Sequence, residues 1–261
     1  MTLLIVLGCL ASGALIGFLG GLLGIGGGLI AIPALALILG MPQQLAQGTS
    51  LILVLPTILL AVRKYSQHSR IDWGVAAAGA LSAIAFTWVG ARLALGIDSS
   101  VLRRSFAVFL FFIAVFYVWQ TWQIGRRARR PAGASAPVRD APRLTRPRGA
   151  ILGVVAGTLG GFFGVGGAIL AVPILTVGFK LSQVNAQALA LSMIIPGSAI
   201  ALGTYTWAGQ ANWMVGVPLA AGSLLFVPTG VKLARRLPER RLRACFAVML
   251  FATVGLLIFE G

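Results

Sequence analysis

Two short glycine clusters carry the residue types and spacing in this sequence that are best suited to chemistry. Gly24-Ile25-Gly26-Gly27-Gly28 lies near the N-terminus, and Gly164-Val165-Gly166-Gly167-Ala168 repeats the pattern 140 positions later. An apolar stretch follows each cluster, so the cluster amides would stand free at a helix N-terminus, where the helix dipole favours an anion. We therefore predict that backbone amides bind an anion at Gly24, Gly26, Gly27, Gly28, Gly164, Gly166, Gly167 and Ala168.

Close helix packing is the alternative role for glycine here. Gly17 and Gly21, like Gly157 and Gly161, have the four-residue spacing that lets membrane helices approach closely. We favour packing for these upstream glycines and anion binding for those in the clusters.

A few polar residues and prolines lie inside the apolar regions that follow. The polar residues could line a substrate cavity or join helices by hydrogen bonds; they are Gln47, Thr49, Ser50, Gln187, Ser192 and Ser198. The prolines could act as hinges that free a backbone carbonyl, or could only kink their helices; they are Pro33, Pro56, Pro173 and Pro196. Both alternatives stay open for each set.

Side chains able to catalyse a reaction are scarce. His68 is the only histidine, Cys9 and Cys245 both lie inside apolar runs, and none of the 5 carboxylates lies in the centre of an apolar region. A serine–histidine hydrolase, a metal site and a buried proton relay therefore each lack parts. We predict no catalytic residue, no metal site, no cofactor and no enzymatic activity.

The composition identifies the setting of these motifs. Apolar residues make up 58% of the 261 residues and charged residues only 10%, against roughly 25% charged in a soluble domain. A soluble protein could not cover its surface with so few charges, and continuous apolar runs exclude an alternating β-barrel. The predicted fold class is an all-α polytopic membrane protein, with the lipid bilayer as a partner.

The net charge of +16 has a simple explanation in that setting. The 21 basic residues lie in short stretches between apolar regions, and eight arginines fall within residues 125–148. Cytoplasmic loops of membrane proteins are enriched in this way. Contact of the linker with anionic lipid is a weaker alternative, and we exclude nucleic-acid binding.

The chain is an internal duplication. Residues 17–35 and 157–175 are identical at ten of nineteen positions, and the offset of 140 then continues without a gap, for example from Tyr65 to Tyr205. The predicted domains are a first transmembrane repeat (1–124), a basic cytoplasmic linker (125–148) and a second transmembrane repeat (149–261). The apolar regions lie at about 3–39, 46–62, 73–95, 104–123, 149–179, 187–207, 213–234 and 244–259.

The loop charges also predict the topology. If the basic loops are cytoplasmic, both ends of 149–179 are cytoplasmic, so this region enters the membrane and returns. About 15 residues precede its glycine cluster and about 12 follow, too few at about 1.5 Å each to cross a core of roughly 30 Å. We expect a re-entrant hairpin there and a matching one over 3–39 from the outer face. This gives two inverted repeats, each with three further transmembrane helices, and both termini outside; secondary transporters are typically built this way.

The doubled motif G-x-x-G-G-x-x-G-h-G-G-[GA]-x-x-h-h-P, with h apolar, resembles the TauE/SafE family of membrane transporters at 17–33 and 157–173. Gln47-Gly48-Thr49-Ser50 and Arg70-Ile71-Asp72-Trp73-Gly74 are similar to that family's first repeat. The resemblance implies export of sulfite or an organosulfur anion such as sulfoacetate. The second repeat has Ala188-Leu189-Ala190 and Asn212 at the matching positions, so we expect fewer side-chain ligands from it.

Together these features predict a secondary transporter of the cell inner membrane that exports a small anion, a sulfur oxyanion or an organosulfonate. A passive anion channel and a structural membrane subunit are the alternatives. The substrate, the coupling ion and the oligomeric state stay open.

Overall fold

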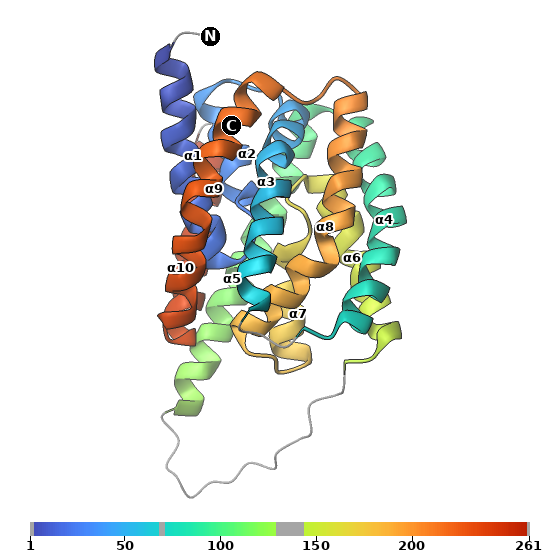
Figure 1. Cartoon of the computed structure of the whole chain (residues 1–261), viewed down its shortest axis with the longest axis vertical. Helices are drawn as coiled ribbons and strands as arrows, with labels where there is room; N and C mark the ends of the chain where they lie inside the picture. Colours follow the sequence, from blue (N-terminus) through green and yellow to red (C-terminus); the bar gives the residue numbers. More distant parts are fainter. Residues whose placement is uncertain (1–2, 68–70, 129–143, 260–261) are drawn as a thin grey trace, which may run out of the picture.

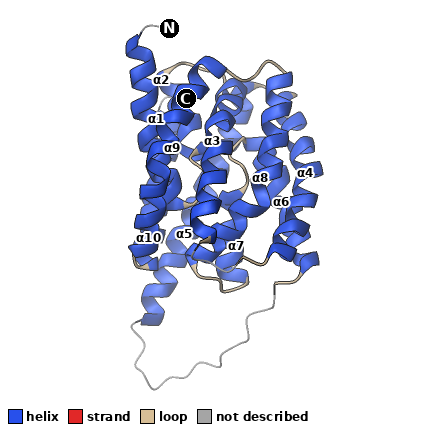
Figure 2. Ribbon diagram, viewed as in Figure 1, coloured by secondary structure: helices blue, strands red, loops and turns tan. Residues whose placement is uncertain are grey.

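The computed structural model describes residues 3–67, 71–128 and 144–259, and within these ranges the chain forms ten α-helices and no strand (Figures 1 and 2). The helices are α1 (Leu3–Leu23), α2 (Gly28–Ile38), α3 (Gln43–Ser66), α4 (Trp73–Leu95), α5 (Ser99–Ala128), α6 (Arg146–Phe163), α7 (Ala168–Gly178), α8 (Gln183–Trp207), α9 (Trp213–Arg236) and α10 (Glu239–Phe259). Among these described residues, six helices are long and apolar enough to cross a membrane, namely α1, α3, α4, α5, α8 and α9. The predicted all-α membrane fold is confirmed.

Several helices begin earlier in the chain than the apolar regions predicted for them. α3, α5, α8 and α10 start three to five residues before the predicted boundaries, because polar residues of the first turn are already helical. At α8, for example, the Ser182 hydroxyl accepts a hydrogen bond from the Asn185 amide and caps the helix. Of the predicted linker, residues 125–128 and 146–148 are helical, and residues 129–143 lie outside the described part of the chain.

Each half opens with a helical hairpin whose second leg is short. α2 and α7 have 11 residues each, about 16 Å at 1.5 Å per residue. α1 has 21 residues, about 31 Å, so the first leg of the N-terminal hairpin is long enough to span a bilayer. In Figure 1 this hairpin enters from the end where both termini lie, and the α6–α7 hairpin enters from the opposite end. Inversion of the halves across a membrane stays a prediction.

The two halves are interlocked. α1 packs most extensively against α9, and α6 packs most extensively against α4. The first leg of each hairpin therefore lies against a long helix of the other half. Glycines at four-residue spacing make the contact: a Cβ on Gly17 would lie 2.5 Å from the Ser223 Cα, and one on Gly157 would lie 2.8 Å from the Ala83 Cα. The upstream glycines therefore pack helices together, which is the role we favoured for them.

α3 and α8 form the centre of the bundle. They are the most deeply buried of the six long apolar helices, and the turns of the two hairpins lie against their middles. Gly26 faces Val54 and Ile58 of α3, and Gly166 faces Ile194 and Ser198 of α8. Both glycine clusters are thus held at mid-height in the interior of the protein.

Candidate anion-binding site at the glycine turns

The two glycine clusters adopt the same backbone conformation. Gly24, Gly26 and Gly27 have φ of 66°, 75° and 87°, and their mates Gly164, Gly166 and Gly167 have 66°, 81° and 76°. Residues other than glycine rarely adopt such φ angles. Gly28 and its mate Ala168 begin the next helices in the ordinary helical conformation, which explains why alanine is accepted at the last position of the second cluster.

The two turns meet in the middle of the bundle. A Cβ placed on Gly28 would lie 3.4 Å from the Val165 Cα and 3.6 Å from the Gly164 carbonyl oxygen. α2 and α7 therefore begin close to each other, one reached from each end of the molecule. Their N-cap residues, Gly27 and Gly167, offer no side-chain cap, so the first amides of both helices lack the partner that a capping side chain would supply.

Two glutamines tie each turn to the opposite half. The Gln187 Nε2 donates to the Leu23 carbonyl at the end of α1, at 2.7 Å. The side chain of its mate, Gln47, packs against Gly164 and accepts a hydrogen bond through Oε1 from the Tyr205 hydroxyl at 2.8 Å. Both glutamines are fully buried. The structure thus brings Gln47 and Gln187 to the turns, where each joins the two halves.

Two tyrosines support the turns from behind, a role that the sequence signalled only by their pairing. Tyr65 donates its hydroxyl to the Gly21 carbonyl at 2.8 Å. The Tyr205 hydroxyl lies 3.2 Å from the Gly161 carbonyl and shares its one hydrogen between this carbonyl and the closer Gln47 Oε1. Gly21 and Gly161 are themselves mates, so the same contact is made in each half. Each bond satisfies a carbonyl near the end of the long leg, which fixes where the glycine turn begins.

The other predicted polar residues are not gathered at one place. Ser50 lies beside the second turn, 3.5 Å from the Gly164 carbonyl, and also donates to the Gln47 carbonyl. Thr49 instead accepts a hydrogen bond from the Asn212 amide at 2.9 Å and so holds the connection between α8 and α9. Ser192 donates to the Ala188 carbonyl within its own helix.

The four prolines all lie inside helices. Pro33 and Pro173 interrupt the short legs α2 and α7, while Pro56 and Pro196 lie near the middles of α3 and α8. A proline at such a position leaves the carbonyl four residues earlier without its helical donor. In α8 that carbonyl belongs to Ser192. The helices beside the turns are therefore weakened at the height of the turns.

The surroundings of the two turns differ in polarity. Beside the first turn, the Thr57 and Ser223 hydroxyls bond to each other at 2.7 Å, and Ile58 covers Gly26. Beside the second turn lies a small space lined in part by Thr87, Gly166 and Ser198, too narrow to admit a water molecule. Both side chains are almost fully buried, and the Ser198 Oγ has no hydrogen-bond partner. The sequence indicated Ser198 only as one of several polar residues that could line a cavity, and it gave no signal for Thr87.

Two further polar atoms at the turns are buried without a partner in the described part of the chain. They are the Gln47 Nε2, a donor, and the Gln187 Oε1, an acceptor. A buried polar atom without a partner costs stability, so it is expected where a ligand or a second conformation satisfies it. With the Ser198 hydroxyl, the turns thus have two unused side-chain donors.

No negative side chain approaches the turns within the described residues. Asp72 lies at the start of α4, where it accepts hydrogen bonds from the Gly74 and Val75 amides, and Asp98 lies just before α5. Asn212 caps α9 in the same way as Asp72 caps α4, so that difference between the repeats preserves a helix cap. The described residues also contain no group of His, Cys, Asp and Glu side chains that could hold a metal ion.

Comparison with known proteins gives a consistent assignment. The profile of the family described as sulfite exporter TauE/SafE matches residues 9–257. A probable membrane transporter protein of Methanocaldococcus jannaschii is 26% identical over 94% of this chain and 91% of its own length. Similar proteins with the same description occur in Xylella fastidiosa (25% identical, over 100% of this chain and 98% of the relative) and Bacillus subtilis (24%, over 99% and 97%). No solved structure matches the chain.

Proposed function

Because the chain belongs to the sulfite exporter TauE/SafE family of membrane transporters, we propose that it is a secondary transporter that exports a small anion, a sulfur oxyanion or organosulfonate such as sulfite or sulfoacetate. Its relatives are named as transporters, which is a non-enzymatic role. One observation carries the choice of an anion: two helix N-termini without side-chain caps meet in the interior of the bundle.

Electrostatics supports this choice. Each helix N-terminus acts as roughly half a positive charge, so α2 and α7 together offer an anion the equivalent of about one. The surroundings are apolar, and a low dielectric strengthens the attraction. The carboxylates of Asp72 and Asp98 stand at helix ends, well away from the turns. The two helix N-termini would repel a cation at the same place.

In the proposed site, backbone amides donate most of the hydrogen bonds to the anion, and a few side chains supply the rest. The amides come from Gly26, Gly27 and Gly28 on one side and from Gly166, Gly167 and Ala168 on the other. The Gln47 Nε2 and the Ser198 hydroxyl, buried without partners, add two donors, and Thr87 lines the adjoining space. The Ser198 hydroxyl comes from the second half and Thr87 from the first, while Thr49 holds the connection between α8 and α9.

Transport requires the turns to separate. The space beside Gly166 is too narrow for water, which favours a carrier that opens alternately over a passive channel. Pro56 and Pro196 would act as the hinges, because α3 and α8 lack a helical hydrogen bond at the height of the turns. Pro33 and Pro173 would allow the short legs to tilt with them.

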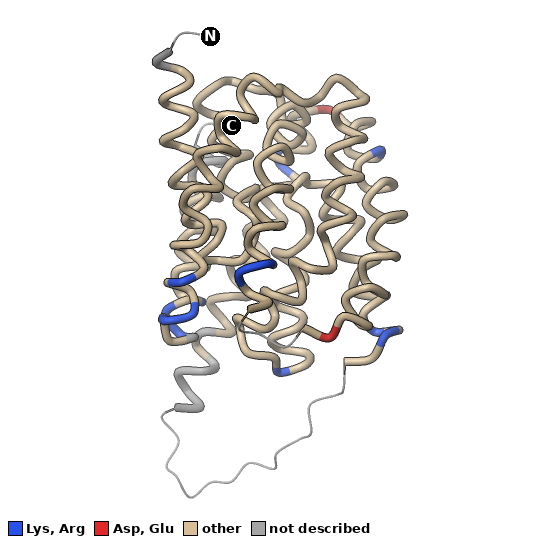
Figure 3. Tube along the Cα trace, in the orientation of Figure 1, with Lys and Arg blue, Asp and Glu red and all other residues tan. Residues whose placement is uncertain are grey.

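The charge distribution supports an orientation. Most described Lys and Arg residues lie at the end where α5 finishes and α6 begins (Figure 3). Arg92, Arg103 and Arg104 are the exceptions at the other end. By the positive-inside rule the linker end would face the cytoplasm and both termini the outside of the inner membrane. Export of an anion would then be downhill, by about 2.3 kcal/mol per charge per 100 mV.

Reconstitution tests the proposal. The purified chain in liposomes should exchange labelled sulfite for internal sulfite, with saturation, and sulfoacetate should compete. Calorimetry on the detergent-purified protein should detect sulfite but not potassium. Single-channel currents would instead identify a channel, and failure of the lone chain to move any anion would favour a structural subunit. Cation binding without anion binding would contradict the site.

A further inference from the structure

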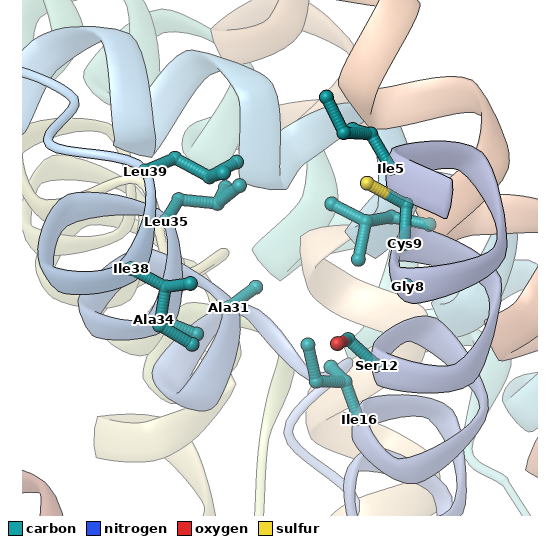
Figure 4. A pocket seen from close by; sticks show the side chains of 11 residues that line it. Ile5, Gly8, Cys9, Ser12, Ile16, Ala31, Ala34, Leu35, Ile38 and Leu39 are labelled. Carbon is teal, nitrogen blue, oxygen red and sulfur yellow. The ribbon is translucent and has the colours of Figure 1, made fainter. Parts of the chain in front are cut away.

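Each hairpin leaves an apolar groove between its two legs. The N-terminal groove, between α1 and α2, has a volume of about 200 Å³, and the linker-side groove, between α6 and α7, about 270 Å³. In Figure 4 the side chains of Ile5, Cys9 and Ile16 on α1 face Leu35 of α2 and Leu39, which follows α2, across the N-terminal groove. The duplication places the two grooves at equivalent positions, since Leu39 lines one and its mate Phe179 the other.

The linker-side groove presents apolar side chains to its surroundings. Ile151, Val155 and Ile174 are 65%, 40% and 38% exposed, while Leu152 is buried. On a multi-pass membrane protein, such residues face the hydrocarbon of the bilayer. An elongated apolar group, rather than water or an ion, therefore fits against this wall.

One end of the linker-side groove carries a positive charge. Arg148, in the first turn of α6, lines the groove and is exposed. It lies seven residues before Val155, about 10 Å along the helix, at the end of the bundle where the basic residues gather (Figure 3). The equivalent position of the N-terminal groove is Gly8, which has no side chain. The two grooves thus share an apolar wall and differ in charge.

We propose that the linker-side groove binds one anionic phospholipid, with an acyl chain along Ile151, Val155 and Ile174 and the headgroup phosphate at Arg148. Basic pockets between membrane helices select anionic lipids in this way. The N-terminal groove, without a charge, would accept an acyl chain regardless of its headgroup. This site is independent of the anion site at the turns, because α6 and α7 line it on their outer faces.

Native mass spectrometry of the full chain in detergent tests the proposal, with phosphatidylglycerol and phosphatidylcholine as probes. Wild-type protein should bind the first phosphatidylglycerol more tightly than phosphatidylcholine. Arg148→Gln should weaken phosphatidylglycerol binding about fivefold and leave phosphatidylcholine unchanged, and Arg148→Lys should restore the preference. Ile174→Trp, which fills the groove, should remove one bound lipid of either kind.

Matched variants separate this site from general effects. Arg104→Gln removes an exposed arginine at the opposite end, and Ala34→Trp fills the N-terminal groove; both should keep the preference for phosphatidylglycerol. Equal binding of the two lipids by wild-type protein, or undiminished phosphatidylglycerol binding by Arg148→Gln, would overturn the proposal. So would displacement of the lipid by inorganic phosphate alone, or a dimer that Ile174→Trp dissociates, which would identify the groove as a contact between two copies.

Discussion

Gln187 of α8 donates a hydrogen bond of 2.7 Å to the Leu23 carbonyl, where the first leg of the opposite half's hairpin ends. Leu23 is followed directly by the first glycine turn, and a Cβ on Gly24 would lie 2.5 Å from the Gln187 Cγ. The second half of the chain therefore holds the first turn in place through one buried side chain.

Replacing this glutamine should destabilise the protein. Gln187→Leu leaves the buried Leu23 carbonyl without its donor, which should cost about 1–3 kcal/mol and lower the Tm in detergent by several degrees. Gln67→Leu, an exposed position after α3, is the matched control and should leave the Tm unchanged. An unchanged Tm for Gln187→Leu would mean that the turn does not depend on this bond.

Enlarging a turn glycine should stop transport without preventing membrane insertion. In Gly26→Val the new Cβ would lie 2.5 Å from the Ile58 Cγ2 at a φ of 75°, and in Gly166→Val it would approach the Ser198 hydroxyl. We expect sulfite exchange in liposomes to fall to background for both variants at normal membrane levels. Gly203→Val, a helical position with open space around it, should exchange at the wild-type rate. Normal exchange in either turn variant would exclude the turns from the mechanism.

Removing the unpartnered Ser198 hydroxyl should weaken anion binding without lowering the stability of the fold. Hydrogen bonds to charged groups contribute about 1.5–3 kcal/mol, so Ser198→Ala should raise the sulfite concentration for half-maximal exchange at least tenfold. Its Tm should not fall, because no bond is lost. Thr57→Val breaks the bond to Ser223 and should show the reverse pattern, with a lower Tm and a nearly unchanged half-maximal concentration. If both variants behave alike, Ser198 has no special contact with the anion.

Labelling from each side of the membrane should reveal the orientation. In a background without Cys9 and Cys245, Ala208→Cys marks the loop between α8 and α9, and Gln67→Cys marks the end of α3. A membrane-impermeant maleimide should label the first from outside intact cells and the second only after the membrane is opened. The opposite result would reverse the proposed topology and the export direction.

Periodicity and repeats predicted much of this architecture, because long apolar runs and duplicated glycines are local signals. α4 begins and ends where its apolar region does. The glycine clusters proved to be turns with positive φ at the matching positions.

The partnerships between residues could not be predicted in the same way. Whether Thr49 lines a cavity or holds the Asn212 amide depends on where α9 begins relative to α3, a distance that no local pattern encodes. Likewise, Ser198 was one of several candidate polar residues, and only its buried hydroxyl without a partner distinguishes it from the others. Pairs formed across the two halves are set by tertiary packing, so the sequence offered several candidates and no order among them.

The exchange of packing partners between the halves bears on how the protein is made. α1 leaves the ribosome before the helix it packs against, α9, which begins only at Trp213. At about 5–20 residues per second, synthesis of the intervening chain takes on the order of 10 to 40 s. For that interval the glycine-lined face of α1 lies in lipid without its partner. This face of α1 would therefore be accessible to a chaperone of the insertion machinery, or to another copy of the chain, during synthesis and not after α9 has packed against it.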